Sequence, residues 1–186
     1  MLKPLLQGLA LMAAAATTTL QAAPRELIID TDPGADDVVA LFLAMASPEE
    51  LNIRAITTVA GNVRLDKTSR NARLAREWAG REDIPVYAGA GRPLVRTPIY
   101  AAEVHGEEGL TGVQVHEPKQ PLAQGSAVQY LVDTLAAAKP QSITLVMLGP
   151  QTNLALALTQ RPEIAKGIQE VVVMGGLTST AATLPR

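Results

Sequence analysis

Four aspartates lie within eight residues near the start of the chain, in the segment 30–37, which reads DTDPGADD. Carboxylates this close repel one another, and a bound cation is one way to keep all of them ionised at neutral pH. A ligand set made only of oxygen atoms favours a hard cation, Ca²⁺ or Mg²⁺. The segment therefore predicts a metal site that could also handle protons.

Two other interpretations of this acidic segment compete with a metal site. Asp36 and Asp37 could simply cap a helix, because acids are favoured in a first helical turn, with Asp30 as a strand-end residue. The haloacid-dehalogenase phosphatases also carry Asp-x-Asp after a first strand, but a Gly-Thr or similar pair usually follows the second Asp. Here Pro33 and Gly34 separate the acids instead, which favours the metal site.

Strands and helices alternate along the chain, which predicts the elements that hold the acidic segment. Short apolar runs indicate strands near residues 27–29, 53–60, 85–88, 143–148 and 171–174. Helical spacing indicates helices over 36–47, 65–78, after a Ser126 cap, and over 152–160. This order predicts an α/β fold with an open, mostly parallel, Rossmann-like sheet and crossover helices. Ligands bind at the carboxyl ends of such strands, where Asp30, Asn62, Gly149 and Gly175 fall.

Three surface features follow from the same patterns. The helix over 36–47 presents Val39, Phe42, Leu43 and Ala46 on one apolar face. A basic residue recurs every third position from Arg64 to Arg76, and a solvated helix face is favoured over an anion site. The stretch 89–125 has little periodicity and predicts a long loop that is functional or disordered.

The acidic segment resembles the signature of the inosine/uridine-preferring nucleoside hydrolases. Four later segments agree with that family in the same order. They are residues 58–62 (TVAGN), 105–110 (HGEEGL), 148–155 (LGPQTNLA) and 173–176 (VMGG). Five ordered motifs over about Glu26 to Gly176 are hard to explain by chance.

The resemblance implies a calcium site with named ligands. Asp32 and Asp37 correspond to its carboxylate ligands, and the backbone carbonyl of Thr152 to a further ligand. Asp32 also corresponds to the general base, and Asp30 is expected to support the site from behind. Thr152 could equally be only a helix N-cap, and the two roles are compatible.

The resemblance also implies a ribonucleoside substrate, hydrolysed to ribose and free base. Asp36 and Asn62 correspond to residues that bind ribose hydroxyls, and His105 to one near the nucleobase. Asn62 could otherwise be only a turn residue, and His116 is expected at the surface. The alternative function is a periplasmic protein that binds ribose or nucleoside and calcium without turnover.

The first residues predict a secretory signal peptide over 1–23, followed by one hydrolase-like domain over 24–186. Lys3 precedes an apolar run too short to span a bilayer, and cleavage is expected after Ala22 or Ala23. The protein is therefore expected to be periplasmic or secreted, with no membrane attachment after cleavage.

Composition limits the kinds of partner and of chemical site that the protein can have. The net charge of −2 gives no basic field for nucleic acid, and the absence of cysteine excludes thiol nucleophiles and thiolate metal sites. A small molecule is the expected partner, and homo-oligomerisation stays open. Members of the family are longer and carry a later Glu-Phe-Asn triplet and His-Asp pair. We therefore expect the sequence to be the N-terminal, truncated portion of that fold, with an exposed sheet edge and apolar surface.

Overall fold

A computed structural model describes residues 22–175. Residues 1–21 of the predicted signal peptide lie outside the described residues, and so does Gly176 of the last motif. Five strands form one sheet, and every neighbouring pair in it is parallel, in the order β3-β2-β1-β4-β5. The strands are β1 Arg25–Thr31, β2 Leu51–Thr58, β3 Val86–Ala88, β4 Ile143–Met147 and β5 Ile168–Val173. The predicted α/β class with a parallel sheet is confirmed.

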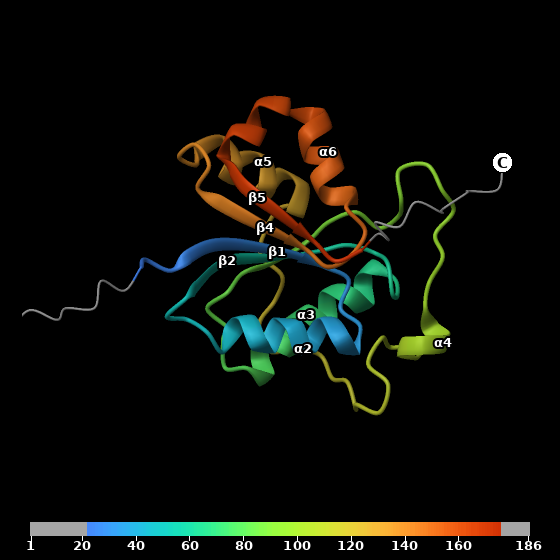
Figure 1. Cartoon of the computed structure of the whole chain (residues 1–186). Helices are drawn as coiled ribbons and strands as arrows, with labels where there is room; N and C mark the ends of the chain where they lie inside the picture. Colours follow the sequence, from blue (N-terminus) through green and yellow to red (C-terminus); the bar gives the residue numbers. More distant parts are fainter. Residues whose placement is uncertain (1–21, 176–186) are drawn as a thin grey trace, which may run out of the picture.

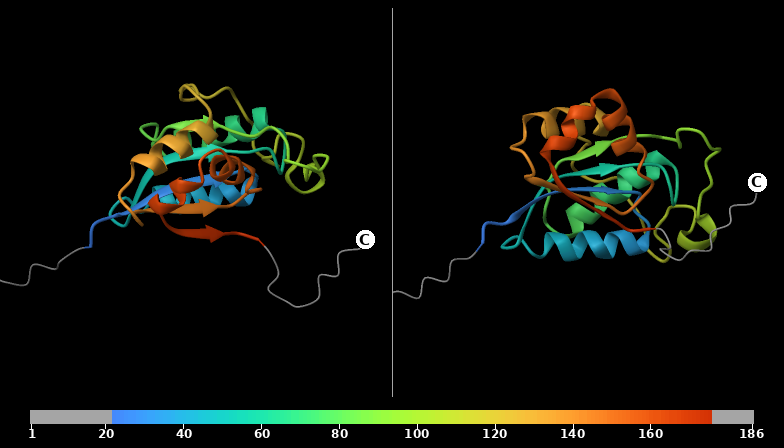
Figure 2. Two further views of the ribbon diagram at one scale, coloured as in Figure 1. Left: turned by 90° about the horizontal axis from the view of Figure 1, so that it is seen from above. Right: turned by 45° about the horizontal axis from the view of Figure 1, so that its top comes forward.

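Helices cover both faces of this sheet (Figures 1 and 2). They are α2 Ala35–Met45, α3 Leu65–Trp78, α4 Ala102–His105, α5 Ala127–Ala137, α6 Thr152–Gln160 and the 3₁₀ helix η1 Pro162–Gly167. Helices α2 and α3 lie on one face, and α5 and α6 lie on the other. The chain builds outward from β1 to β3 and then returns to place β4 beside β1, so right-handed crossovers put the later helices on the opposite face. The strand order therefore reverses between β1 and β4, where sheets of this class bind ligands.

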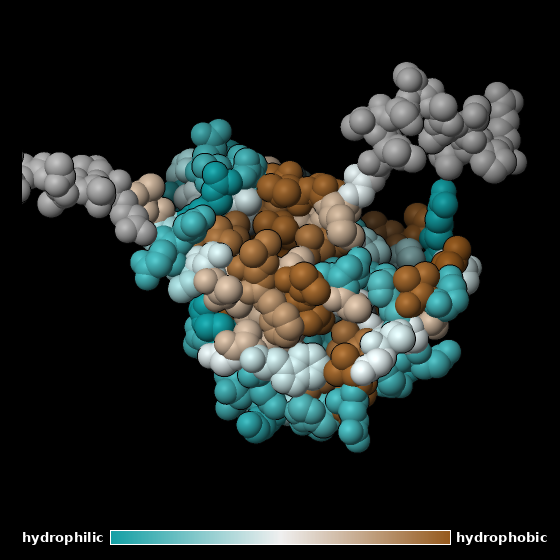
Figure 3. Space-filling model, turned by 60° about the horizontal axis from the view of Figure 1, so that its bottom comes forward, coloured by the Kyte–Doolittle hydropathy of each residue, from teal (hydrophilic) through white to brown (hydrophobic). Residues whose placement is uncertain are grey.

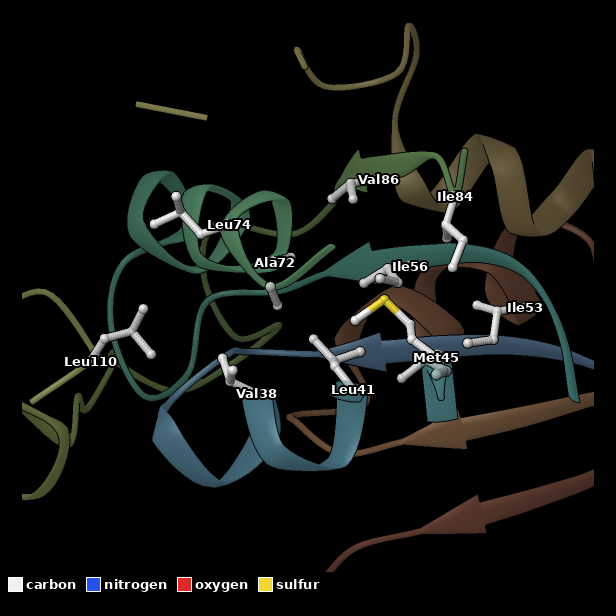
Figure 4. Close-up of a cluster of buried hydrophobic side chains, with 12 residues drawn as sticks. Val38, Leu41, Met45, Ile53, Ile56, Ala72, Leu74, Ile84, Val86 and Leu110 are labelled. Carbon is white, nitrogen blue, oxygen red and sulfur yellow. The ribbon is translucent and has the colours of Figure 1, made fainter. Parts of the chain in front are cut away.

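Two hydrophobic cores hold the layers together, one on each side of the sheet. Val38, Leu41 and Met45 point from α2 toward Ile53 and Ile56 of β2 in the first core (Figure 4). The second core joins α5, α6 and η1 to β4 and β1. Strand β1 contributes to both cores, which makes its carboxyl end a rigid base for the residues that follow.

The apolar face predicted for α2 is wrong. The helix buries Val38, Leu41 and Met45, while Val39 and Leu43 are 66% and 71% exposed. Apolar residues surround this helix on most sides, so their spacing did not single out the buried face. Leu43 and neighbouring residues of α2 instead border an open apolar groove that extends to Val172 on β5, and Figure 3 shows a hydrophobic patch on this side. The edge strand and apolar surface expected from the sequence are present.

The solvated basic face predicted for α3 is also wrong. The long segment 89–125 packs along that face, and the basic side chains bond to it. Arg70 pairs with Glu108, Arg73 with Glu117, and the buried Arg76 donates to the carbonyl of Pro121. The segment is irregular apart from the four-residue α4, and the guanidinium groups of α3 give it partners that its own backbone lacks.

Other boundaries follow the sequence closely. Helix α6 spans the predicted residues, and Ser126 caps α5 by accepting a hydrogen bond from the Gln129 amide at 3.2 Å. Strand β5 begins at Ile168, earlier than predicted. Within residues 22–175, no helix has both the length and the apolarity to cross a membrane.

Candidate active site

The acidic segment follows β1 directly and lies at the point where the strand order reverses. Asp30 is in the strand, and Asp32 comes directly after it. The exposed fractions of Asp30, Asp32 and Asp37 are 1%, 5% and 3%, so three carboxylates are removed from solvent. Asp36 differs, because its side chain is 64% exposed. The segment thus divides into three inward-facing acids and one that faces solvent.

Asp30 is held between β2 and α6. Its Oδ2 accepts hydrogen bonds from Thr57 Oγ1 at 2.6 Å and from Asn153 Nδ2 at 2.8 Å. Its Oδ1 is buried without a hydrogen-bond partner among the described residues. Burial raises the pKa of Asp30 to about 6, and the two hydrogen bonds limit the rise. This placement behind the acidic turn fits the supporting role predicted for Asp30, which stays a prediction.

Asp32 lies between two glycine-containing turns. The backbone amide of Asn62 donates to Asp32 Oδ2 at 2.7 Å. A Cβ built on Gly61 would lie 1.9 Å from Oδ2, and one built on Gly149 would lie 2.4 Å from Oδ1. Only glycine therefore lets the turns after β2 and β4 close on this carboxylate. Burial, and then the charge of Asp37, raise the pKa of Asp32 to about 7.

Asp37 caps α2 while facing the same site. Its Oδ1 accepts from Thr31 Oγ1 at 2.7 Å, and its Oδ2 accepts from the Gly34 amide at 3.2 Å. Burial raises the pKa of Asp37, and the hydrogen bond from Thr31 opposes the rise. The helix-capping interpretation therefore describes Asp37 correctly, but capping does not account for its desolvation beside a second carboxylate.

Asn62 joins the two acids. Besides its amide contact to Asp32, its side-chain Nδ2 donates to the Asp32 carbonyl and to Asp37 Oδ2, both at 3.1 Å. Its own carbonyl accepts from the Ala101 amide at 2.9 Å, which ties the start of α4 to the site. Asn62 is more than a turn residue here, and its predicted contact with ribose stays a prediction.

His105 reaches the acidic turn from the long irregular segment. Its Nδ1 lies 3.9 Å from Asp36 Oδ1, and a Cβ on Gly34 would be 2.6 Å from the same nitrogen. His116 lies elsewhere, next to Glu77 and edge-on to Trp78. The structure thus brings His105 to the predicted site and leaves His116 away from it.

Thr152 begins α6 close behind the Gly149 turn and is buried, with its amide donating to the Pro150 carbonyl at 2.8 Å. No contact of its carbonyl group tests the predicted metal ligation. Its neighbour Asn153 also contacts the site, although the sequence motifs predict no role for it. Asn153 Nδ2 donates to Asp30 Oδ2 and to the Thr58 carbonyl, and its Oδ1 accepts from the Ala90 amide. An Asn at the start of an otherwise apolar helix was the available signal.

The donor atoms at this turn suit a hard cation, but the carboxylates alone do not complete its coordination. Asp32 and Asp37 present desolvated carboxylates whose ionised forms repel each other, so a cation would stabilise both. Within residues 22–175, no three His, Cys, Asp or Glu side chains are grouped closely enough to hold a metal by themselves. A metal at this turn would therefore need uncharged oxygens, such as backbone carbonyls or water, beside the two carboxylates.

Comparison with known proteins now decides the family. The sequence model of one protein family, the inosine-uridine preferring nucleoside hydrolases, matches residues 27–183. The chain belongs to this family. An inosine-uridine preferring nucleoside hydrolase of Leishmania major is 44% identical over 163 residues, which cover 87% of this chain and 52% of that protein. A pyrimidine-specific ribonucleoside hydrolase, RihA, of Salmonella schwarzengrund is 48% identical over 150 residues, covering 81% of this chain and 48% of that one.

The fold agrees with that assignment. The solved structure of a plant nucleoside hydrolase superposes with a TM-score of 0.77 at 40% identity, covering 83% of this chain and 48% of the other. The chain spans about half the length of the curated relatives it matches. The match includes the whole acidic turn and the Asn62, His105 and Thr152 segments.

Proposed function

We propose that the protein hydrolyses the N-glycosidic bond of ribonucleosides, releasing ribose and free base. The observation that carries this proposal is the arrangement around the acidic turn. Asp32 and Asp37 are buried side by side under Asn62, while Asp36 and His105 border the same turn from the solvent side. Family membership supports the reaction class, and the relatives are named for different base preferences.

We propose Ca²⁺ as the cation, held by the carboxylates of Asp32 and Asp37 and by the backbone carbonyl of Thr152. The oxygen-only donor set and the desolvation of both acids support this choice. When bound, the cation would lower the pKa of a coordinated water and offset the charge of the two carboxylates.

The residues of the chain can then be given roles. Asp32 takes the proton from the attacking water at a carboxylate oxygen; burial and the charge of Asp37 raise the pKa of this group to about 7 in the metal-free chain, in support of a role in proton transfer. The water oxygen bonds to the anomeric carbon, and the electron pair of the broken bond leaves with the base nitrogen. The exposed carboxylate of Asp36 and the amide of Asn62 orient the ribose hydroxyls.

His105 is proposed to contact the nucleobase. It comes from a segment distant in sequence and packs against the turn at Gly34, beside the exposed Asp36. Asp30 keeps Asp32 in place through β1 and does not touch the substrate. The positive charge that develops on the ribose during bond cleavage is stabilised by the nearby carboxylates.

The test is release of ribose from inosine and uridine by calcium-loaded protein. Asp32→Asn should lower the rate by about 10²–10⁴-fold, the usual contribution of a general base. Asp133→Asn, on the exposed side of α5, is the matched control and should leave the rate unchanged. Absence of reducing sugar from every common ribonucleoside would contradict the proposal. Heat of ribose or nucleoside binding in calcium without product would instead support the binding-only function.

We also propose that the protein is exported to the periplasm or secreted, as the signal-peptide pattern of residues 1–23 predicts. Cell fractionation and N-terminal sequencing of the mature protein test this. A new N-terminus at Ala23 or Pro24 is expected. An intact Met1 on protein recovered from the cytoplasmic fraction would contradict export.

A further inference from the structure

Asn71 lies in the middle of α3 and connects two segments that meet at the site. Its side chain is fully buried. Its Nδ2 donates to the Pro33 carbonyl at 3.0 Å and to the Glu108 carbonyl at 2.9 Å. Pro33 belongs to the acidic turn, and Glu108 lies three residues after His105 in the long irregular segment. One amide group thus joins the turn to the segment that carries the histidine.

The orientation of this amide is determined by its neighbours. Arg70 approaches the Asn71 Oδ1 with two of its nitrogens, at 3.1 and 3.3 Å, and a guanidinium can only donate. The other end of the amide faces two carbonyl oxygens, which can only accept. Exchanging the nitrogen and the oxygen would oppose donors to donors and acceptors to acceptors, so Nδ2 must face the two carbonyls.

The packing around Asn71 leaves little freedom. Gly109 has a φ of +78° and lies against it, and a Cβ there would be 2.8 Å from Asn71 Nδ2 and 3.3 Å from the Pro33 carbonyl oxygen. Leu110, the next residue, packs in the core between α2 and α3 (Figure 4). Asn62 also joins the turn to this segment by hydrogen bonds, and it contacts the carboxylates themselves.

We propose that Asn71 is a positioning residue that sets the separation between His105 and the acidic turn, so that one nucleoside can touch both. This inference rests on the proposed function for its biological meaning, but the geometry stands without it. An apolar side chain here would leave the Pro33 and Glu108 carbonyls without this donor. A buried amide with both hydrogens committed to backbone carbonyls instead determines distance and direction together.

Histidine-selective NMR tests the proposal without requiring activity. The sequence holds two histidines, so untagged protein labelled at histidine gives one ring signal for each. Asn71→Asp keeps the side-chain size and the contact with Arg70 but removes the donors to Pro33 and Glu108. The His105 signal should move by more than its linewidth, and the His116 signal should stay in place.

Arg73→Gln is the matched control on the same helix. Arg73 bonds to Glu117, next to His116, and to the Gln120 carbonyl. This variant should move the His116 signal and leave His105 unchanged. Unchanged His105 in folded Asn71→Asp, or equal movement of both signals in both variants, would overturn the proposal.

Gly109→Ala changes the same contact from the side of the long segment, and it provides the test if Asn71→Asp does not fold. The added methyl must displace the loop from Asn71, so the His105 signal should move here too, and an unmoved signal overturns the inference. In an active preparation, Asn71→Asp should raise KM about tenfold, because loss of the two hydrogen bonds displaces His105, with a smaller change in kcat. Wild-type protein without ribose release, but with the predicted NMR pattern, would refute the proposed function and leave the positioning role standing.

Discussion

The acidic turn and the loop-facing side of α3 both bury charge, but they satisfy it in different ways. Arg76 is 3% exposed, and its guanidinium donates to carbonyls of Ile84, Gln120 and Pro121. Asp32 and Asp37 are buried to a similar degree, yet no Lys or Arg among residues 22–175 forms an ion pair with them. Their partners are amides and a hydroxyl.

This difference separates a structural use of buried charge from a functional one. The arginines find their partners within the chain, so their burial fastens the long segment to α3. The two carboxylates have no cationic partner among residues 22–175 and have raised pKa values, which is the arrangement expected of a functional site. Variants on the two sides should therefore respond differently to calcium, pH and salt.

The largest expected effect on stability is at Arg76. Arg76→Met retains much of the apolar volume but leaves the buried carbonyl of Ile84 and the partly buried carbonyls of Gln120 and Pro121 without this donor. An unsatisfied buried group costs about 1–3 kcal/mol. We expect a loss of about 3 kcal/mol or more in the free energy of unfolding, measured by urea denaturation, with no dependence on calcium. Arg64→Met is the control, because Arg64, the N-cap residue of the same helix, pairs with Asp66 at the surface. Equal losses in the two variants would contradict the structural role.

Calcium should raise the stability of the folded protein by binding at the acidic turn. Binding to the folded state alone stabilises it by ~2.7 kcal/mol at a hundredfold excess over Kd, which should raise Tm by several degrees. Asp37→Asn should remove most of that rise. Asp36→Asn should keep it, because the neighbouring Asp36 carboxylate is mostly exposed. A wild-type melting curve that does not change in millimolar calcium would show that the turn binds no calcium in this chain.

The sequence predicted most of this framework because the relevant signals are local. Helix α6 and the Ser126 cap follow from spacing within a few residues. The grouping of Asp32, Asn62 and Gly149 follows from one topological rule, since parallel strands end at the same edge.

The missed features depend on partners far away in the chain. The basic residues of α3 look solvated until a segment about 40 residues later packs on them, as in the pair of Arg70 and Glu108. In the sequence, Asn71 and Asn153 are ordinary polar residues of helical patterns. Only the fold shows that each side chain is fully buried and hydrogen-bonded to the site. Helical periodicity likewise could not choose the buried face of α2, because apolar residues occur on nearly every side.

The pH dependence of stability should also differ between the two regions. Asp30 and Asp32 have pKa values of about 6 and 7 in the folded chain, raised from 3.8 by burial. Between about pH 4 and pH 7, the folded chain therefore binds more protons than the unfolded chain. This contribution to stability is complete below about pH 4 and is lost as pH rises through 6 to 7. In chelator, we expect a lower Tm at pH 8 than at pH 5.5.

Calcium should reverse that trend, because it binds the ionised carboxylates, so the rise in Tm on adding calcium should grow with pH. The measurement is a series of melting curves from pH 5 to pH 8 with and without calcium. A metal-free Tm that climbs steadily over this range would contradict the assignment of raised pKa values to these acids. The Arg76→Met variant should retain the wild-type pH profile at a lower Tm, since it leaves the carboxylates in place.

The smallest effect is expected where α3 meets solvent. Arg73 Nη2 lies 2.8 Å from Glu117 Oε1, but the Glu117 side chain is 75% exposed. Glu117→Gln should therefore cost only about 0.5 kcal/mol, and the cost should shrink with added salt. Glu103→Gln is the control, since Glu103 is exposed on α4 and forms no ion pair among residues 22–175. A loss above ~2 kcal/mol that persists in high salt would mean that this pair behaves as buried charge, and the fastening of the loop would then depend on Arg73 as much as on Arg76.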